Sequence, residues 1–207
     1  MLFLDKVILL TGDCGLLGSH LRNFFLDKGA TVYGVDTDNN NVYAHKNYVK
    51  CRGDISQPEF INKLVKILKE NHEALDVLIN NAAINDSLEN QSLTVEESKF
   101  ENFPLDLWKK TLAVNLTGPF LLCQKLTNLM INSNNASIIN IASTYGMVAP
   151  KQDLYMDKEG IQYFYKGPAY SVTKAGLIMF TKYLASYYGE TNIRVNSISP
   201  GGIKNGQ

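Results

Sequence analysis

The chain has 207 residues, enough for one α/β domain with a sizeable core. Its 20 basic and 20 acidic residues cancel, which gives no reason to expect nucleic acid or an anionic membrane as a partner. No apolar run approaches the roughly 20 residues of a membrane span, and three separated cysteines, Cys14, Cys51 and Cys123, fit reduced cytoplasmic thiols better than disulfides or a metal site.

Apolar runs alternate with amphipathic stretches along the whole chain. We expect strands at 6–10, 31–35, 48–51, 75–79, 137–141 and 193–198. We expect helices at 15–28, 58–70, 104–131 and 170–188, a loop with a short helix at 85–101 and an irregular segment at 149–168. This alternation predicts a single α/β domain over 1–207, a doubly wound parallel sheet. Ligands bind such sheets at the carboxyl ends of the strands.

The turn after the first strand is rich in glycine and reads TGDCGLLG over residues 11–18. Glycines permit a tight turn and let a pyrophosphate approach the backbone, while the following helix presents free N–H groups. An ordinary tight turn is the alternative, but the position between a strand and a helix favours a dinucleotide site. The expected contacts are Gly12, Cys14, Gly15, Leu16, Leu17 and Gly18.

Asp36 ends the second strand, where a carboxylate accepts hydrogen bonds from the ribose hydroxyls and repels the 2′-phosphate of NADP. Neither Cys14 nor Thr37, its expected neighbours, supplies a compensating cation. We therefore predict NAD rather than NADP as the cofactor, with a solvated turn aspartate as the alternative. Asp54, followed by Ile55, is placed to meet the adenine edge after the third strand, although a helix-capping role fits nearly as well.

Two further motifs end predicted strands. Residues 80–83 read NNAA and end the fourth strand beside the expected cofactor, and residues 200–203 read PGGI and end the sixth, where the backbone can meet the carboxamide. The cofactor contacts expected from these motifs are Asn81, Ala82, Ala83, Pro200, Gly201 and Ile203.

Tyr170 and Lys174 lie one turn apart on the same face of a predicted helix. Tyrosine has a pKa near 10 and is a poor base at neutral pH, but a nearby ammonium and a cationic nicotinamide favour the phenolate. Lowering that pKa by about three units takes roughly 4 kcal/mol, which two close cations can supply. Because the Tyr-x-x-x-Lys pattern alone is common, its weight depends on the other residues around it.

Two polar residues accompany this pair. Ser143 follows the fifth strand, where its hydroxyl can bond a substrate oxygen, or it is an ordinary turn serine. Asn115 lies within a long predicted helix, and a buried asparagine there is costly unless partnered. It can hold a water that relays protons to Lys174, or it is a helix-bend residue.

The glycine turn, NNAA, the helical asparagine, the strand-end serine, YSVTK and SPGGI occur in this order and together resemble the short-chain dehydrogenase/reductase family. The resemblance covers essentially the whole chain. It implies an enzyme that interconverts a carbonyl and an alcohol with NAD, with a catalytic tetrad of Asn115, Ser143, Tyr170 and Lys174. Tyr170 would be the general acid/base, and Lys174 would also bind the nicotinamide ribose. The resemblance further implies a homodimer or homotetramer, paired through the helices at 104–131 and 170–188.

The chain also departs from the family pattern. The spacing of the three turn glycines looks like the family's longer, sugar-nucleotide branch, whereas the other motifs look like its shorter, single-domain branch, to which we assign the chain. Ala83 replaces a glycine, which is tolerated if its φ is not positive. Asn205 stands where a threonine is common. The resemblance implies a further helix and strand beyond Gln207, so we expect this sequence to be part of a longer chain, with a truncated product as the alternative. Ser143 and Tyr170 lie 27 positions apart, roughly twice the usual separation, so residues 149–168 form an insertion.

The insertion bears on the substrate. Its tyrosines and lysines, among them Tyr163 and Lys166, favour a wall over the active site that binds a small polar substrate such as a sugar or sugar phosphate. The chain also looks similar to oxidoreductases of bacterial flagellin and surface-sugar modification. A plain surface loop is the alternative for the insertion. The alternative functions are a 3-oxoacyl carrier-protein reductase-like enzyme and a non-catalytic NAD-sensing protein.

Overall fold

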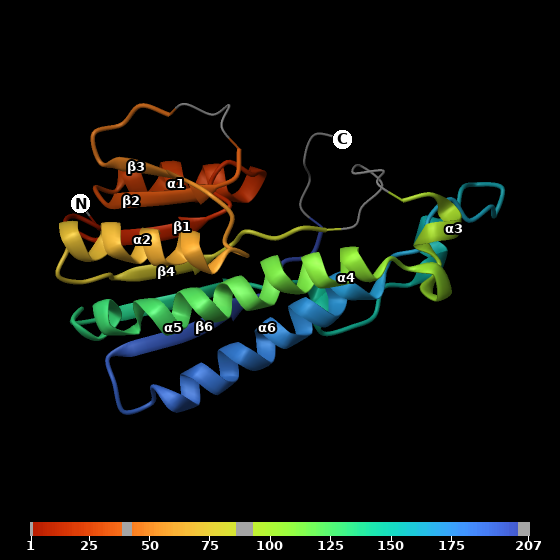
Figure 1. Ribbon diagram of the computed structural model, residues 1–207. Coiled ribbons are helices and arrows are strands. Elements are labelled where there is room, and N and C mark those ends of the chain that lie inside the picture. The colour runs from red at the N-terminus through yellow and green to blue at the C-terminus, as the bar shows by residue number, and fades with distance from the viewer. Residues whose placement is uncertain (1, 39–42, 86–92, 203–207) are drawn as a thin grey trace.

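The computed structural model describes residues 2–38, 43–85 and 93–202. Within these ranges, six parallel strands form one sheet in the order β3-β2-β1-β4-β5-β6 (Figure 1). The strands are β1 (Val7–Thr11), β2 (Thr31–Asp36), β3 (Tyr48–Arg52), β4 (Val77–Asn80), β5 (Ala136–Ile141) and β6 (Ile193–Ile198). The order reverses direction between β1 and β4, as in doubly wound dinucleotide-binding sheets. The predicted doubly wound parallel sheet is confirmed.

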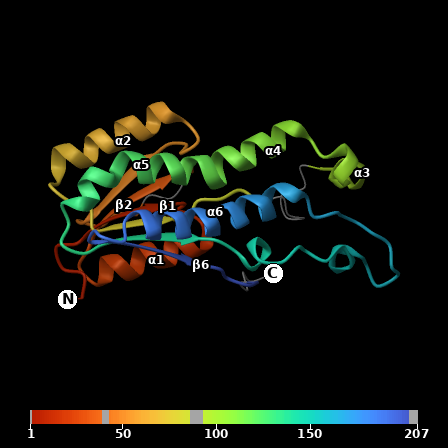
Figure 2. The ribbon, with the colours of Figure 1, turned by 90° about the horizontal axis from the view of Figure 1, so that it is seen from below.

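Helices cover both faces of this sheet. Figure 2 shows α1 (Leu16–Asp27) on one side, with α2 (Pro58–Asn71) and α5 (Gly118–Ile131) on the other. The apolar residues of β1 alternate accordingly: Ile8 and Leu10 belong to the core on the α1 side, and Leu9 to the core on the opposite side. The helix α6 (Pro168–Tyr187) lies with α2 and α5. No helix in the described ranges combines the length and hydropathy that a membrane span requires.

The single helix predicted over 104–131 is wrong in one respect. The structure has α4 (Leu105–Leu112), then a π-helical turn, η3 (Ala113–Thr117), and then α5. A π-helical turn inserts one residue into the helical repeat and often marks a functional site. The apolar spacing did not reveal it, because apolar residues recur in the sequence both before and after the turn.

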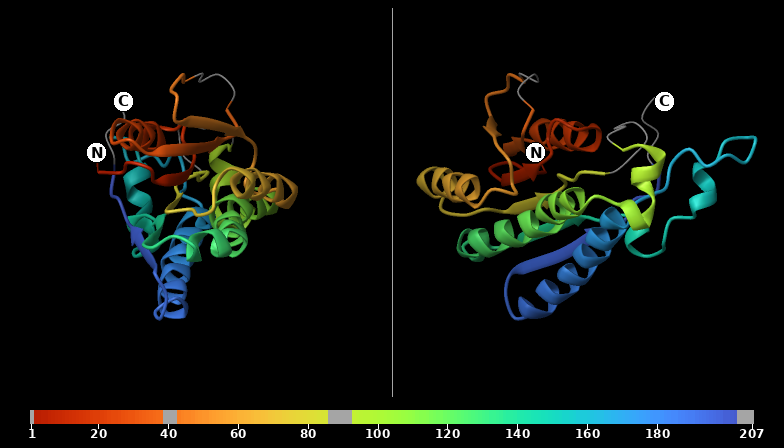
Figure 3. Two further views of the ribbon diagram at one scale, coloured as in Figure 1. Left: turned by 90° about the vertical axis from the view of Figure 1, so that its left-hand side faces the viewer. Right: turned by 45° about the vertical axis from the view of Figure 1, so that its right-hand side comes forward.

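The insertion projects from one end of the molecule. Figures 1 and 3 show that the 149–168 segment and α3 (Val95–Ser98) lie together beyond the start of α4. The backbone N–H of Tyr165 donates to the Ser98 hydroxyl at 3.0 Å. The segment contains a 3-10 turn, η5 (Gln152–Tyr155), and an antiparallel bridge between Met156 and Gln162. The segment therefore has internal structure and is attached to α3 at Tyr165, although most residues of 151–163 are exposed.

Candidate active site

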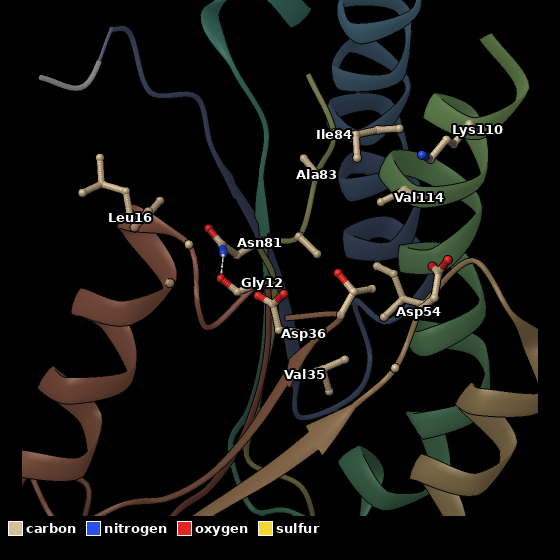
Figure 4. Close-up of a pocket in the computed structure, with 17 residues that line it drawn as sticks. Gly12, Leu16, Val35, Asp36, Asp54, Asn81, Ala83, Ile84, Lys110 and Val114 are labelled. Carbon is tan, nitrogen blue, oxygen red and sulfur yellow. Dashed lines mark hydrogen bonds between the residues drawn. The ribbon is translucent and has the colours of Figure 1, made fainter. Parts of the chain in front are cut away.

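A cavity of about 490 Å³ opens at the carboxyl ends of β1, β2 and β4 (Figure 4). Most of the predicted cofactor contacts line it: Gly12, Gly15, Leu16, Leu17, Gly18, Asp36, Asp54, Ile55, Asn81, Ala82 and Ala83. The sequence interpretation missed six other lining residues: Val35, Thr37, Gly53, Ile84, Lys110 and Val114. The first four adjoin predicted residues, so proximity in sequence was a usable signal. Lys110 and Val114 come from α4 and η3, for which no local signal existed.

The glycine turn has the geometry of a phosphate cradle. Gly12 has a φ of 68°, which disfavours any residue with a side chain, and a Cβ there would lie 2.9 Å from the Cα of Ala82. A Cβ on Gly18 would lie 1.9 Å from the carbonyl oxygen of Gly12, so α1 packs directly on the turn. Gly15 caps α1 without a side-chain hydrogen bond. The first N–H groups of α1 are thus available to an anion, and the cradle fits a dinucleotide pyrophosphate.

Asn81 holds the turn in place from β4. Its side-chain amide donates to the carbonyl oxygens of Thr11 and Gly12, at 2.9 and 3.0 Å. The hydroxyl of Thr11 in turn accepts the backbone N–H groups of Asn81 and Ala82, both at 3.0 Å. Ala83 does not have a positive φ, so the expectation that alanine is tolerated there is confirmed.

Asp36 lies at the end of β2 and lines the cavity. Its carboxylate accepts the backbone N–H groups of Cys14 and Asp38, each at 3.0 Å. The expectation that no cation lies near it is wrong, because Lys50 of β3 reaches this region: its Nζ lies 2.6 Å from the Cys14 sulfur. Burial by itself would lower the pKa of Lys50, but the contact with Cys14 and the charges of Asp13 and Asp36 outweigh it, so this pKa is raised. Lys50 reaches this region because β3 pairs with β2, in a register that puts Lys50 opposite Gly34, two residues before Asp36.

Beneath the turn, the buried Asp13 forms a cluster of charges. Its carboxylate accepts the Tyr48 hydroxyl at 2.5 Å and lies 3.5 Å from Arg22 and 3.6 Å from Lys50. Potential metal-ligand atoms of Asp13, Cys14 and Asp36 lie within 4.8 Å of one another. Because two cations already lie against Asp13, we assign this group as an ion-pair cluster. The predicted contact Cys14 faces Lys50 and does not line the cavity.

Asp54 lines the cavity, so its contact with the adenine edge stays a prediction. Its carboxylate accepts the backbone N–H of Ser56 at 2.8 Å in the turn before α2. The N-cap of α2 is Gln57, without a side-chain hydrogen bond, so the helix-capping alternative for Asp54 is wrong.

Tyr170 and Lys174 lie together on α6, as their spacing predicts. The Nζ of Lys174 is 5.6 Å from the centroid of the Tyr170 ring and donates to the Ile141 carbonyl oxygen at 2.6 Å. Lys174 is only 2% exposed. Burial lowers the pKa of Lys174 to about 8.

Asn115 lies in the π-helical turn and is fully partnered. Its side-chain oxygen accepts the N–H of Ile84 at 2.8 Å, and its amide donates to the Ile84 carbonyl at 2.9 Å and to the Thr173 hydroxyl at 3.2 Å. Asn115 thus connects η3 to the segment after β4 and to α6. The helix irregularity that was the alternative for this residue is present as well.

Ser143 is buried just after β5, and its oxygen accepts the backbone N–H of Tyr145 at 3.1 Å. The N–H of Thr144 donates to the Pro200 carbonyl at 3.1 Å, so the ends of β5 and β6 meet here. Pro200 and Gly201 lie at this junction rather than along the 490 Å³ cavity. The predicted contact Ile203, like Asn205, lies outside the described residues.

One cation near Tyr170 was not anticipated. Lys166, from the end of the insertion, is 6% exposed, and its Nζ lies 5.2 Å from the centroid of the Tyr170 ring. It also donates to the side-chain oxygen of Asn85. The sequence placed Lys166 near the mouth of the cleft but gave no signal that it contacts Tyr170.

Comparison with known proteins gives consistent matches. A family model described as enoyl-(acyl carrier protein) reductase matches residues 17–207. An NAD-dependent glycerol dehydrogenase of Listeria innocua is 32% identical over 95% of this chain and 70% of its own length. A short-chain dehydrogenase of Leptospira borgpetersenii with bound NAD+ superposes with a TM-score of 0.84 and 32% identity, covering 99% of this chain and 74% of the other. Pseudomonas aeruginosa RhlG, in a complex with NADP, gives a TM-score of 0.76 and 25% identity, with 97% and 74% covered.

Proposed function

The chain belongs to the short-chain dehydrogenase/reductase family of oxidoreductases, and we propose that Tyr170 is the general acid/base of its hydride-transfer reaction. The observation that supports this most directly is the buried Lys174 ammonium 5.6 Å from the Tyr170 ring. NAD supplies the hydride acceptor when bound. As an alcohol is oxidised, the Tyr170 oxygen takes the hydroxyl proton, and in reduction it returns that proton to the carbonyl oxygen.

The other proposed tetrad residues act around this transfer. Lys174 stabilises the phenolate by its charge and binds the nicotinamide ribose. The oxygen of Ser143 already accepts a backbone N–H from Tyr145, which leaves the serine O–H as a donor that can orient the substrate oxygen. Asn115 completes the proton relay, from a position where it also braces α6 through Thr173.

We propose NAD as the preferred cofactor. Gly12 and Gly18 shape the turn for the pyrophosphate, and Asp36 presents its carboxylate where the adenosine ribose would lie. Lys50 is engaged by Asp13 and Cys14 beside Asp36, so it is a poor partner for a 2′-phosphate. The names of the Listeria and Leptospira proteins support NAD, while the Pseudomonas complex shows that NADP also occurs among similar folds.

The cofactor preference can be tested by fluorescence titration. NADH should bind at least about tenfold more tightly than NADPH, because the Asp36 carboxylate repels the extra phosphate. Asp36→Asn should reduce the ratio of the NADPH to the NADH dissociation constant, whereas the neighbouring Asp38→Asn should change this ratio little. Tighter binding of NADPH by the unmodified protein would contradict the assignment.

We propose a small polar substrate, such as a sugar or sugar phosphate. The insertion contributes aromatic rings and lysines near α6, and the Listeria relative is named for glycerol, a small polyol. A second candidate is an acyl chain on a carrier protein, which the description of the matching family model favours. Asp36 opposes the NADP expected of that reaction. The presence of both Tyr170 and Lys174 opposes a non-catalytic NAD-binding protein.

Turnover measurements separate these candidates and test Tyr170. The protein should be assayed with NAD on polyols, sugars and sugar phosphates, and with NADH on 3-oxoacyl thioesters. On the substrate found, Tyr170→Phe should lower kcat by about 100-fold or more, since a general acid/base is lost. NADH affinity should stay within about twofold, because the ring remains. Tyr183→Phe, which removes the hydroxyl of an exposed tyrosine on the same helix, is the matched control. Ordinary turnover by Tyr170→Phe would overturn the mechanism.

A further inference from the structure

Two lysines, and not one, place their ammonium groups beside the Tyr170 ring. Lys174 approaches from the next turn of α6, and Lys166 from the segment that leads into this helix. Both distances to the ring centroid, 5.2 Å for Lys166 and 5.6 Å for Lys174, are within the range in which a cation interacts with an aromatic ring. The spacing of Lys166, Tyr170 and Lys174 is four residues on each side, but only the second interval is helical, because α6 begins at Pro168.

The insertion holds the backbone of Lys166 in a fixed position. The side chain of Gln152 accepts the Lys166 N–H at 2.8 Å and donates to the Lys166 carbonyl at 3.1 Å. Gln162 in turn donates to the carbonyls of Gln152 and Phe164, at 2.9 and 2.5 Å. Phe164 is buried and packs edge-on against Tyr155, with 5.7 Å between the ring centroids. Lys166 is therefore part of a folded unit and not the end of a mobile arm.

The burial of Lys166 is costly by itself. Lysine is almost never fully buried in proteins unless it has partners; Lys166 is only 6% exposed, and its Nζ donates to the Asn85 side chain as well as facing the Tyr170 ring. The insertion also carries Lys151 and Lys158, and both of these are exposed. The fold thus selects one of three lysines and brings it to the tyrosine of the proposed mechanism. Such placement of a charge at a site is typical of a functional role.

We propose that Lys166 is a second active-site cation, which the 149–168 insertion holds against Tyr170 to stabilise its ionised phenolate form together with Lys174. The inference rests on the proposed role of Tyr170. Lys166 is a positioning residue, because it acts through the charge of Tyr170. An opposite charge within about 4–6 Å lowers the pKa of an acid by about one to three units. Lys166 thus adds a second positive charge to the one that Lys174 already places beside the ring.

Other titratable groups lie on the elements packed against α6. Tyr145 of η4 places its hydroxyl 3.4 Å from that of Tyr155. The helix α4 carries Asp106, Lys109 and Lys110, of which Lys110 lines the cofactor cavity. All of these groups remain in every variant below, so that a difference between variants reports on Lys166.

The test is the ionisation of Tyr170 in the full chain without substrate. The phenolate absorbance of each variant is titrated against pH, and the same titration on a matching Tyr170→Phe protein is subtracted. Lys166→Met should raise the Tyr170 midpoint by about one unit or more, whereas Lys166→Arg, which keeps the charge, should stay within about 0.3 units. Lys158→Met, which removes an exposed lysine from the same insertion, should have no effect.

An unchanged midpoint in folded Lys166→Met would overturn the proposal, as would an equal shift in Lys158→Met. Should Lys166→Met fail to fold, Gln152→Ala replaces it. This variant keeps the lysine but removes both hydrogen bonds that fix its backbone, and it should shift the midpoint in the same direction. No shift there would then overturn the proposal. Since the readout needs no turnover, its failure is distinguishable from a failure of the proposed oxidoreductase reaction.

Discussion

Lys174 carries its ammonium into a region from which water is nearly excluded. Its side chain is 2% exposed, and desolvation lowers its pKa from the ordinary value of 10.5 to about 8. The same charge that serves Tyr170 therefore destabilises the fold. A pKa shift of this size corresponds to a cost of roughly 3 kcal/mol in the free energy of folding. The hydrogen bond from Lys174 to the Ile141 carbonyl offsets part of this cost.

Lys174→Met should therefore stabilise the protein while abolishing its activity. At pH 7 we expect the free energy of unfolding to rise by about 1–2 kcal/mol. The folded-state pKa is depressed, so between pH 8 and 10.5 the unfolded chain binds more protons than the folded one. The penalty is thus complete below pH 8 and disappears as the pH rises through 10.5. Denaturant unfolding of the wild type and Lys174→Met at pH 7 and pH 10 measures this penalty, with the exposed Lys182→Met as control. A lower free energy of unfolding for Lys174→Met than for the wild type at pH 7 would refute the prediction.

At the scale of residues, local geometry decided what the sequence could predict. Tyr170 and Lys174 were found from a helical spacing of four, and Gly12 and Gly18 from their place between a strand and a helix. Lys50 and Lys166 were not found as neighbours of Asp36 and Tyr170. Lys50 arrives through the pairing of β3 with β2, and Lys166 through the folding of the insertion. Neither contact is encoded within a short window of sequence.

At the scale of elements, periodic patterns were predicted well and aperiodic ones were not. The buried run KVILL placed the first strand at 6–10, and β1 spans Val7–Thr11. The break between α4 and α5 was missed, because a π-helical turn adds one residue without interrupting the apolar content. The insertion has no periodicity to read. Its structure depends on Gln152 and Gln162, whose side chains form hydrogen bonds with backbone groups. No sequence pattern around a glutamine predicts such a role.

At the scale of the whole molecule, the doubly wound parallel sheet followed from general rules, although its strand order was not predicted. Right-handed crossovers and the alternation of strands and helices leave few ways to arrange six parallel strands. This arrangement brings the ends of β1, β2 and β4 together at the cavity. The sequence therefore predicted that the glycine turn, Asp36 and the NNAA motif would meet there. It wrongly added Pro200 and Gly201, and it did not predict the charges of Lys50 and Lys110.

The two helices expected to pair in an oligomer divide their apolar residues between the core and the surface. Leu122 and Leu184 are buried in the core and cannot contribute to an interface. Phe120 and Met179 are 44% and 62% exposed, and Phe120 contacts Phe180 at 6.0 Å between ring centroids. The exposed apolar surface of α5 and α6 also includes Val172, Tyr183 and Tyr187. Contiguous exposed apolar residues of this kind mark interaction surfaces.

We propose that this surface of α5 and α6 pairs with its copy about a two-fold axis, since an isologous interface places the same apolar residues on both sides. Light scattering at micromolar concentration should give two or four times the 23.1 kDa of the chain. Replacing Phe120 and Met179 together by Glu should yield a folded monomer, because two charges would be buried in the interface without partners. Ile161→Glu, which alters an equally exposed residue of the insertion, should leave the mass unchanged. A monomeric mass for the unmodified protein would show that these helices have another partner or none.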